Sequence, residues 1–112
     1  FHCKTSKDGK PLLTKEHYNK MKPTSYIINA ARGNIVDEND LNIALNENLI
    51  AGAAVDVFSK EPAKENVLFN NPKVILSPHI AASTSEASIV VAEMIANQIS
   101  DFLLKGVKIN TV

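Results

Sequence analysis

Three ionisable side chains of this sequence follow short apolar runs and carry groups that could act on a carbonyl compound. They are Arg32, Glu61 and His79, and the runs that precede them are residues 25–29, 51–57 and 74–76. Short apolar runs of this kind are typical of buried parallel strands, and ligands of open α/β sheets bind at the carboxyl ends of the strands. A guanidinium, a carboxylate and an imidazole at that edge could polarise a carbonyl group and exchange a proton with it.

Each residue type suits one part of that chemistry. The planar fork of an arginine matches a substrate carboxylate, and an imidazole exchanges protons near neutral pH. A carboxylate beside an imidazole favours its charged form and fixes its orientation. Residue types alone leave simpler interpretations open. Arg32 could be a surface arginine, His79 a loop histidine, and Glu61 a solvated residue before Pro62.

Helical signals lie between the apolar runs. Thr14 is a good N-cap for a short helix that reaches about Met21, and Pro23 should stop it. Asp37 can cap a second helix through the amides of its first turn, and the apolar positions that follow recur at helical spacing. These positions are Leu41, Ala44, Leu45 and Leu49. Residues 1–3 are predicted to end a further strand.

A longer helix is predicted toward the C-terminal end. Ser83-x-x-Glu86 matches a capping box, so this helix should begin near Thr84, and Gly106 should end it. Its apolar stripe consists of Val91, Ile95, Ile99, Phe102 and Leu103. Strands and helices therefore alternate along the chain, which predicts an α/β fold with a parallel sheet and flanking helices.

Composition narrows the functional classes. The 112 residues are 45% hydrophobic and 21% charged, which is typical of a folded soluble domain. Twelve basic residues balance twelve acidic ones, so no net field favours nucleic acid or an anionic membrane as a partner. The single cysteine, Cys3, excludes an internal disulfide, and no ligand cluster predicts a metal. We find no apolar run near the roughly 20 residues of a membrane helix, and expect a cytoplasmic protein.

Three motifs, in order along the chain, carry a family resemblance. They are Asn29–Asp37, Ala51–Pro62 and Ser77–Thr84. With these motifs the chain resembles the D-isomer-specific 2-hydroxyacid dehydrogenases over nearly its whole length. Within that family the segment from His79 to Ala87 looks most like the phosphoglycerate dehydrogenase branch. Glutamine at this position would resemble the formate dehydrogenase branch, so Glu61 argues against that branch.

The resemblance implies a Rossmann-like domain and an oxidoreductase that transfers a hydride between NAD and a D-2-hydroxyacid, with 3-phosphoglycerate as the favoured substrate. It implies that Arg32 binds the substrate carboxylate and polarises the carbonyl. His79 would exchange the proton and Glu61 would pair with His79. The cofactor-binding residues that it implies are Ala30, Ala31, Arg32, Asp56, His79, Ala81 and Ala82. The alternative interpretation of Asp56 is a strand-end cap, and we favour the cofactor interpretation.

The resemblance also marks what this sequence lacks. The glycines, Gly9, Gly33, Gly52 and Gly106, cannot form the G-x-G-x-x-G turn that family members carry upstream. We therefore expect residues 1–107 to be only the C-terminal portion of an NAD-binding domain, with 108–112 starting a return toward a substrate domain. The isolated chain should have no useful NAD affinity.

Several alternatives stay open. The protein could be a hydroxypyruvate or glyoxylate reductase, a corepressor-like NAD-binding protein, or an inactive fragment. A small 2-hydroxyacid or 2-oxoacid is the expected partner, with neither nucleic acid nor membrane. By resemblance, the full-length protein should be a homodimer or a higher oligomer.

Overall fold

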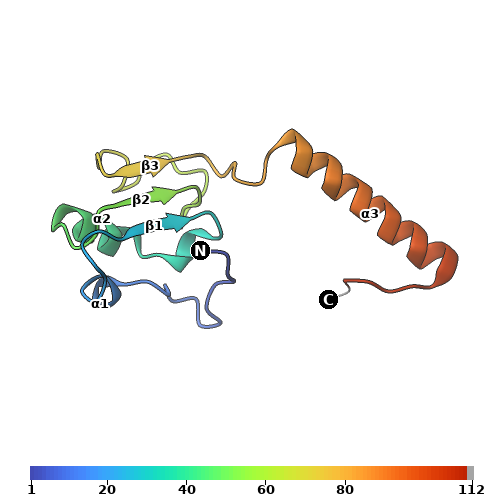
Figure 1. The fold of residues 1–112 in the computed structure, drawn as a ribbon, viewed down its shortest axis with the longest axis horizontal. Coiled ribbons are helices and arrows are strands. Elements are labelled where there is room, and N and C mark those ends of the chain that lie inside the picture. The colour runs from blue at the N-terminus through green and yellow to red at the C-terminus, as the bar shows by residue number, and fades with distance from the viewer. Residues whose placement is uncertain (111–112) are drawn as a thin grey trace. The chain divides into compact units, whose positions relative to one another are not determined.

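The computed structural model describes residues 1–110, which form two compact units that divide between Ala81 and Ala82. The first unit contains a parallel sheet of three strands in the order β1-β2-β3. The strands are β1 (Tyr26–Asn29), β2 (Gly52–Val55) and β3 (Val74–Leu76). They lie side by side and run in one direction, so their carboxyl ends meet at one edge of the sheet (Figure 1). The predicted parallel α/β sheet is confirmed.

Two helices and one short turn accompany these strands. They are α1 (Lys15–Tyr18), a 3₁₀ turn at Gly33–Ile35, and α2 (Glu38–Asn46). Helix α1 precedes β1, and the turn and α2 lie between β1 and β2. The predicted cap of α2 is confirmed, because the Asp37 carboxylate accepts a hydrogen bond of 3.0 Å from the amide of Asp40. Helix α1 is shorter than predicted, since hydrogen-bonded turns replace it after Tyr18.

The core of the first unit lies between α2 and one face of the sheet. Leu41, Ala44 and Leu45 of α2 are fully buried, as the helical spacing predicted. They pack in one cluster with apolar side chains of the sheet and of the connections, including Ile27, Val55, Ile35 and Leu68. Burial of this apolar face is the main source of stability for so small a unit.

The opposite face of the sheet is open. Tyr26, Ile28 and Ile75 are 70%, 62% and 75% exposed, because strand side chains alternate between the two faces. The expectation that these strands are buried is therefore wrong for one face. Residues 1–3 form no strand, which corrects a second expectation.

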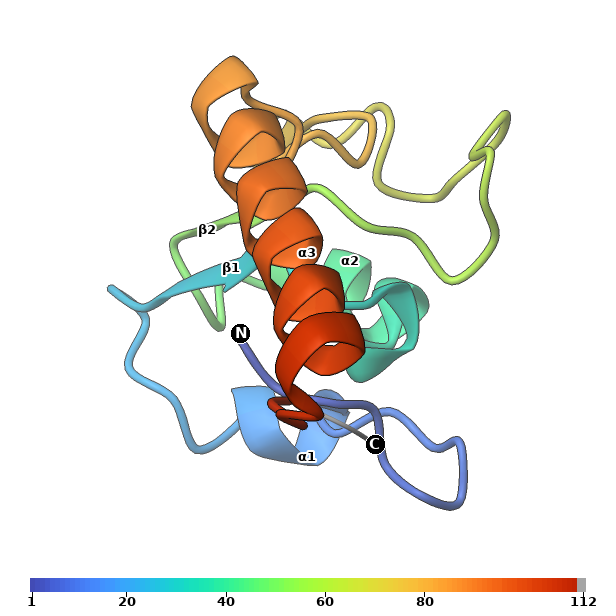
Figure 2. The ribbon, with the colours of Figure 1, turned by 90° about the vertical axis from the view of Figure 1, so that its right-hand side faces the viewer.

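The second unit is built on α3 (Ser85–Lys105), which Figure 2 shows as one unbroken helix. Its N-cap is Thr84, whose hydroxyl accepts a hydrogen bond from the amide of Ala87. The capping box predicted on Ser83 is therefore wrong by one residue. Gly106 ends the helix in the left-handed conformation with φ of 67°, as predicted.

None of the residues of α3 is buried, and its apolar stripe is exposed as well. By length and composition alone, α3 could cross a membrane, so the expectation that no segment reaches that length is wrong. Core helices of soluble proteins pass the same test, and this property assigns no membrane role to the helix. The predicted segment 108–112 lies partly outside the described residues.

Candidate active site

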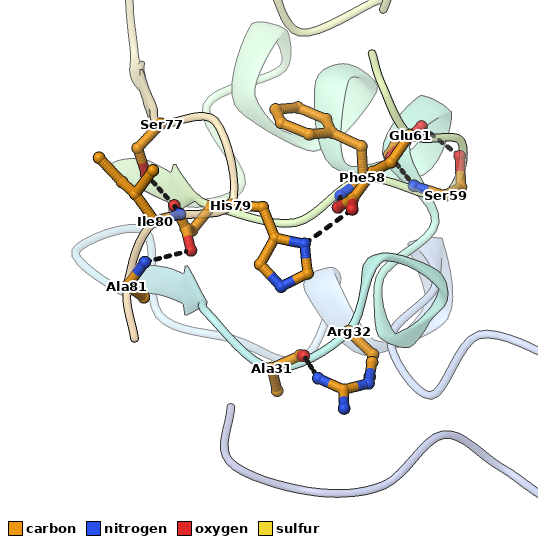
Figure 3. Close-up of polar contacts among 11 residues, drawn as sticks. Ala31, Arg32, Phe58, Ser59, Glu61, Ser77, His79, Ile80 and Ala81 are labelled. Carbon is orange, nitrogen blue, oxygen red and sulfur yellow. Dashed lines mark hydrogen bonds and ion pairs between the residues drawn. The ribbon is translucent and has the colours of Figure 1, made fainter. Parts of the chain in front are cut away.

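His79 and Glu61 form an ion pair at the carboxyl edge of the sheet. The Nδ1 atom of His79 lies 2.7 Å from Oε2 of Glu61 (Figure 3). The second oxygen of this carboxylate, Oε1, accepts a hydrogen bond of 2.9 Å from the amide of Phe58. The hydrogen bond from the Phe58 amide has the largest effect on the pKa of Glu61, and the hydrogen bond with His79 has the next largest favourable one. Together they hold this pKa below its usual range.

This arrangement sets the roles of the two nitrogens of the imidazole. An ionised carboxylate only accepts hydrogen bonds, so Nδ1 of His79 must carry the hydrogen that Glu61 receives. Nε2 is then the nitrogen that can give a proton to a ligand or take one from it. The side chains of both residues are partly exposed, at 52% for His79 and 35% for Glu61, so a small molecule can reach the pair.

The backbone of His79 has an unusual conformation. Its φ is 55°, a left-handed value that costs a non-glycine residue about 1–3 kcal/mol unless its surroundings hold it. Asp56, which directly follows β2, provides that support. Its carbonyl accepts from the amide of His79 at 2.8 Å, and its carboxylate accepts from the amides of Ile80 and Ala81, both at 2.9 Å.

The carboxylate of Asp56 is buried, with only 6% of the residue exposed. Burial by itself would raise the pKa of this group. The hydroxyl of Ser77 and the two loop amides outweigh that effect and hold the pKa of Asp56 below its usual range. Asp56 is therefore an ionised anchor for the loop that carries His79.

Arg32 lies just after β1, in a turn that is organised by a buried asparagine. The side chain of Asn29 donates to the carbonyl of Arg32 at 3.0 Å and accepts from the amide of Ala31 at 3.2 Å. The guanidinium is exposed, and its Nη1 donates to the carbonyl of Ala31 at 2.7 Å. The turn therefore fixes the backbone and leaves most donors of the fork available for a ligand.

Gly33 allows this turn to approach the chain after β2 closely. A Cβ atom at this position would lie 1.8 Å from the carbonyl oxygen of Phe58, so only glycine fits here. Arg32, Glu61 and His79 consequently line one hollow of about 320 Å³. The three residues that the sequence singled out thus share one site, and their catalytic roles stay a prediction.

A second hollow, of about 640 Å³, adjoins the first and shares Phe58, Glu61 and His79 with it. Its other lining residues are mainly apolar and include Phe69 and Leu76. Among residues 1–110, no group of three His, Cys, Asp or Glu side chains lies close enough to hold a metal ion.

The predicted cofactor-binding residues lie in the segments that follow the strands. Ala30 and Ala31 follow β1, Asp56 follows β2, and Ala81 ends the first unit. Ala82 is the first residue of the second unit. The amide of Ala81 and the carboxylate of Asp56 bond to each other, so the structure reveals an anchoring role for Asp56 that the sequence reasoning offered only as its alternative.

The exposed donors at this edge are compatible with one end of NAD, and the roles of the individual cofactor-binding residues stay a prediction. An exposed guanidinium and imidazole beside the strand ends suit a nicotinamide and a small acid. The sequence has no glycine-rich turn for the pyrophosphate. Asn29, whose side chain holds the turn around Arg32, was not among the predicted site residues. Its position at a strand end, three residues before Arg32, was the available signal.

Known proteins of one family are similar to this chain in sequence. Residues 1–81 match the family model for the D-isomer specific 2-hydroxyacid dehydrogenase, NAD binding domain. The chain is 46% identical over 104 residues to D-3-phosphoglycerate dehydrogenase of Synechocystis sp., covering 93% of this chain and 19% of that protein. It is 45% identical over 109 residues to glyoxylate reductase of Thermofilum pendens, covering 95% of this chain and 31% of that protein.

Solved structures agree on the fold. A glyoxylate reductase from Paecilomyes thermophila superposes with a TM-score of 0.85 at 30% identity, over 96% of this chain and 33% of that one. The chain thus spans between about a fifth and a third of the length of these relatives. The chain belongs to the D-isomer specific 2-hydroxyacid dehydrogenases, and its first 81 residues match their NAD-binding domain.

Proposed function

We propose that this chain supplies the catalytic residues of an NAD-dependent oxidoreductase that interconverts a D-2-hydroxyacid and a 2-oxoacid. The observation that carries the proposal is the His79–Glu61 pair, which shares one hollow with the exposed guanidinium of Arg32. A carboxylate-oriented imidazole beside a guanidinium is suited to moving a proton at an oxygen next to a bound carboxylate.

The residues then have distinct tasks. Arg32 binds the substrate carboxylate and polarises the C2 oxygen. In the oxidation direction, Nε2 of His79 takes the hydroxyl proton from the substrate. In the reduction direction, His79 returns that proton to the carbonyl oxygen. Glu61 stays ionised and holds Nδ1–H, so the same nitrogen always faces the substrate.

The bound cofactor would supply the hydride chemistry. Ala30, Ala31, Asp56, Ala81 and Ala82 would lie along its nicotinamide end. A complete cofactor site also needs a cradle for the pyrophosphate, and this sequence contains no glycine-rich turn that could form one.

For the substrate we favour 3-phosphoglycerate, which would place the protein in serine biosynthesis in the cytoplasm. For the full-length protein we favour a homodimer or a higher oligomer. The similarity to the Synechocystis dehydrogenase and the His79–Ala87 segment support this choice. Glyoxylate or hydroxypyruvate is the second candidate, because the Thermofilum relative is a glyoxylate reductase of nearly equal identity.

A chimera tests the proposed activity. The matching segment of the Synechocystis dehydrogenase is replaced by the corresponding residues of this chain, and NADH oxidation is followed with 3-phosphohydroxypyruvate. We expect turnover in this chimera. A chimera that folds and binds NADH, yet turns over no 2-oxoacid, would refute the proposal.

A second host addresses the substrate. The same replacement is made in the Thermofilum glyoxylate reductase and measured with glyoxylate. If this chain is adapted to 3-phosphoglycerate, the Synechocystis chimera should keep a larger share of the kcat/KM of its host. The reverse ranking would favour the glyoxylate assignment.

A further inference from the structure

Glu38, the first residue of α2, holds the loop that carries Glu61. One of its carboxylate oxygens, Oε1, accepts from the amide of Ser59 at 2.7 Å. The other, Oε2, accepts from the hydroxyl of Ser59 and from the side-chain amide of Asn66, both at 2.8 Å. A single carboxylate therefore connects two points of one loop to the helix.

The two points bracket Glu61. Ser59 lies two residues before it and Asn66 five residues after it, and the chain between them has no helix or strand. Lys60, Glu61 and Pro62 are exposed, so burial does not fix these three residues. The hydrogen bonds that Glu38 accepts therefore restrain this loop, together with the packing of Ala63 against the core.

Both ends of this connection are firmly placed. Glu38 follows the Asp37 cap of α2, a helix whose apolar face is fully buried in the core. On the loop side, the side chain of Asn66 also accepts from the amide of Leu68, which is itself fully buried. Glu38 thus ties the loop to the rigid part of the first unit.

The path to the imidazole is short. Ser59 is covalently bonded to Phe58, whose amide donates to one oxygen of Glu61, and the other oxygen contacts His79. Displacement of Ser59 therefore moves the amide that orients Glu61. We propose that Glu38 is a positioning residue that acts through this loop on the Glu61–His79 pair. The effect on turnover rests on the proposed function, whereas the effect on the Glu61 carboxyl does not.

The test separates positioning from a general structural role. Glu38→Gln can still accept from the Ser59 amide but places a donor against Asn66. Glu65→Gln is the matched control, because it makes the same substitution within the loop that Glu38 holds, and no side-chain hydrogen bond to Glu65 is present among residues 1–110. The readout is the titration of the Glu61 carboxyl, followed by carbon-13 NMR in the full 112-residue chain.

We expect Glu38→Gln to raise the pKa of Glu61 toward the usual glutamate value, since the Phe58 and His79 hydrogen bonds lower it now. Glu65→Gln should leave it unchanged. Asn66→Asp added to Glu38→Gln restores a donor–acceptor pair and should reverse the shift. In the Synechocystis chimera, Glu38→Gln should lower kcat roughly tenfold to a hundredfold with the KM for NADH unchanged.

An unchanged Glu61 titration in Glu38→Gln would overturn the inference, as would an equal shift in the Glu65→Gln control. If Glu38→Gln does not fold, Ser59→Ala decides the matter, because it removes only the hydroxyl hydrogen bond. A raised Glu61 pKa in that variant supports positioning, and an unchanged one contradicts it. A chimera without turnover would count against the proposed function alone, since the NMR titration needs no activity.

Discussion

Replacement of Gly33 by alanine tests whether the close approach of two loops builds the site. The added Cβ would lie 1.8 Å from the carbonyl oxygen of Phe58, where real Cβ contacts stay beyond 3.0 Å. The atoms that collide also include the carbonyl carbon of Phe58 and the amide of Ser59, all of them backbone, so no side chain can rotate away. The two loops must separate by about 1.2 Å, the difference between 3.0 and 1.8 Å.

That separation acts on both stability and geometry. Forcing an extra methyl group into a packed site costs about 1–3 kcal/mol. For a domain of this size, each kcal/mol lowers Tm by about 4–8 °C. The same movement takes Phe58, and with it the Glu61 carboxylate, away from Arg32. A misplacement of about 1 Å in a catalytic site can reduce kcat/KM on the order of a hundredfold.

The assays are thermal unfolding of the chain and steady-state kinetics of the Synechocystis chimera. Gly9→Ala is the control, because Gly9 has a φ of +72° and no atom within 4 Å of an added Cβ. It should lower stability through backbone strain and leave turnover intact. If Gly33→Ala lost no more activity than Gly9→Ala, the reasoning about the two loops would be refuted.

Three further predictions follow from buried or paired polar groups. Asp56→Asn should lower the free energy of unfolding by about 1–3 kcal/mol, because the NH₂ group of the introduced asparagine must face a backbone donor of the loop. The measurement is urea unfolding, and an unaltered midpoint would contradict the anchoring role. The folded pKa values of Asp56 and Glu61 lie below their ordinary 3.8 and 4.5, so their contribution to stability is complete above about pH 5 and is lost as the pH falls through the folded pKa values. Tm should therefore decline below about pH 5, and less steeply in Glu61→Gln; identical profiles would exclude that contribution. Tyr18→Phe should raise the free energy of unfolding by about 1 kcal/mol, because it removes a buried hydroxyl that has no hydrogen-bond partner among the described residues, whereas a loss of stability would show that the hydroxyl is satisfied.

Local sequence signals predicted most of the elements. The three apolar runs became parallel strands, Asp37 capped α2, and Gly106 ended α3. These features depend on residues near one another in the chain, where spacing and side-chain type are sufficient. The cap of α3 was misplaced because Ser83 and Thr84 have the same capping chemistry, and only the backbone of the folded loop selects Thr84.

The supporting contacts of the site could not be predicted from local patterns. Glu38 reaches Ser59 across 21 residues, and Asp56 reaches the amide of Ala81 across 25. Such pairs depend on how loops from different strands meet, which side-chain type does not reveal. The exposure of one sheet face was also missed, since apolar strand residues look alike whether or not something covers them.

The central claim is that His79 transfers the proton, and its replacement tests this most directly. In the Synechocystis chimera, His79→Ala should lower kcat about a hundredfold or more, the usual contribution of a positioned acid–base group. NADH binding, measured by fluorescence titration, should survive. Turnover equal to that of the unmodified chimera would contradict the account.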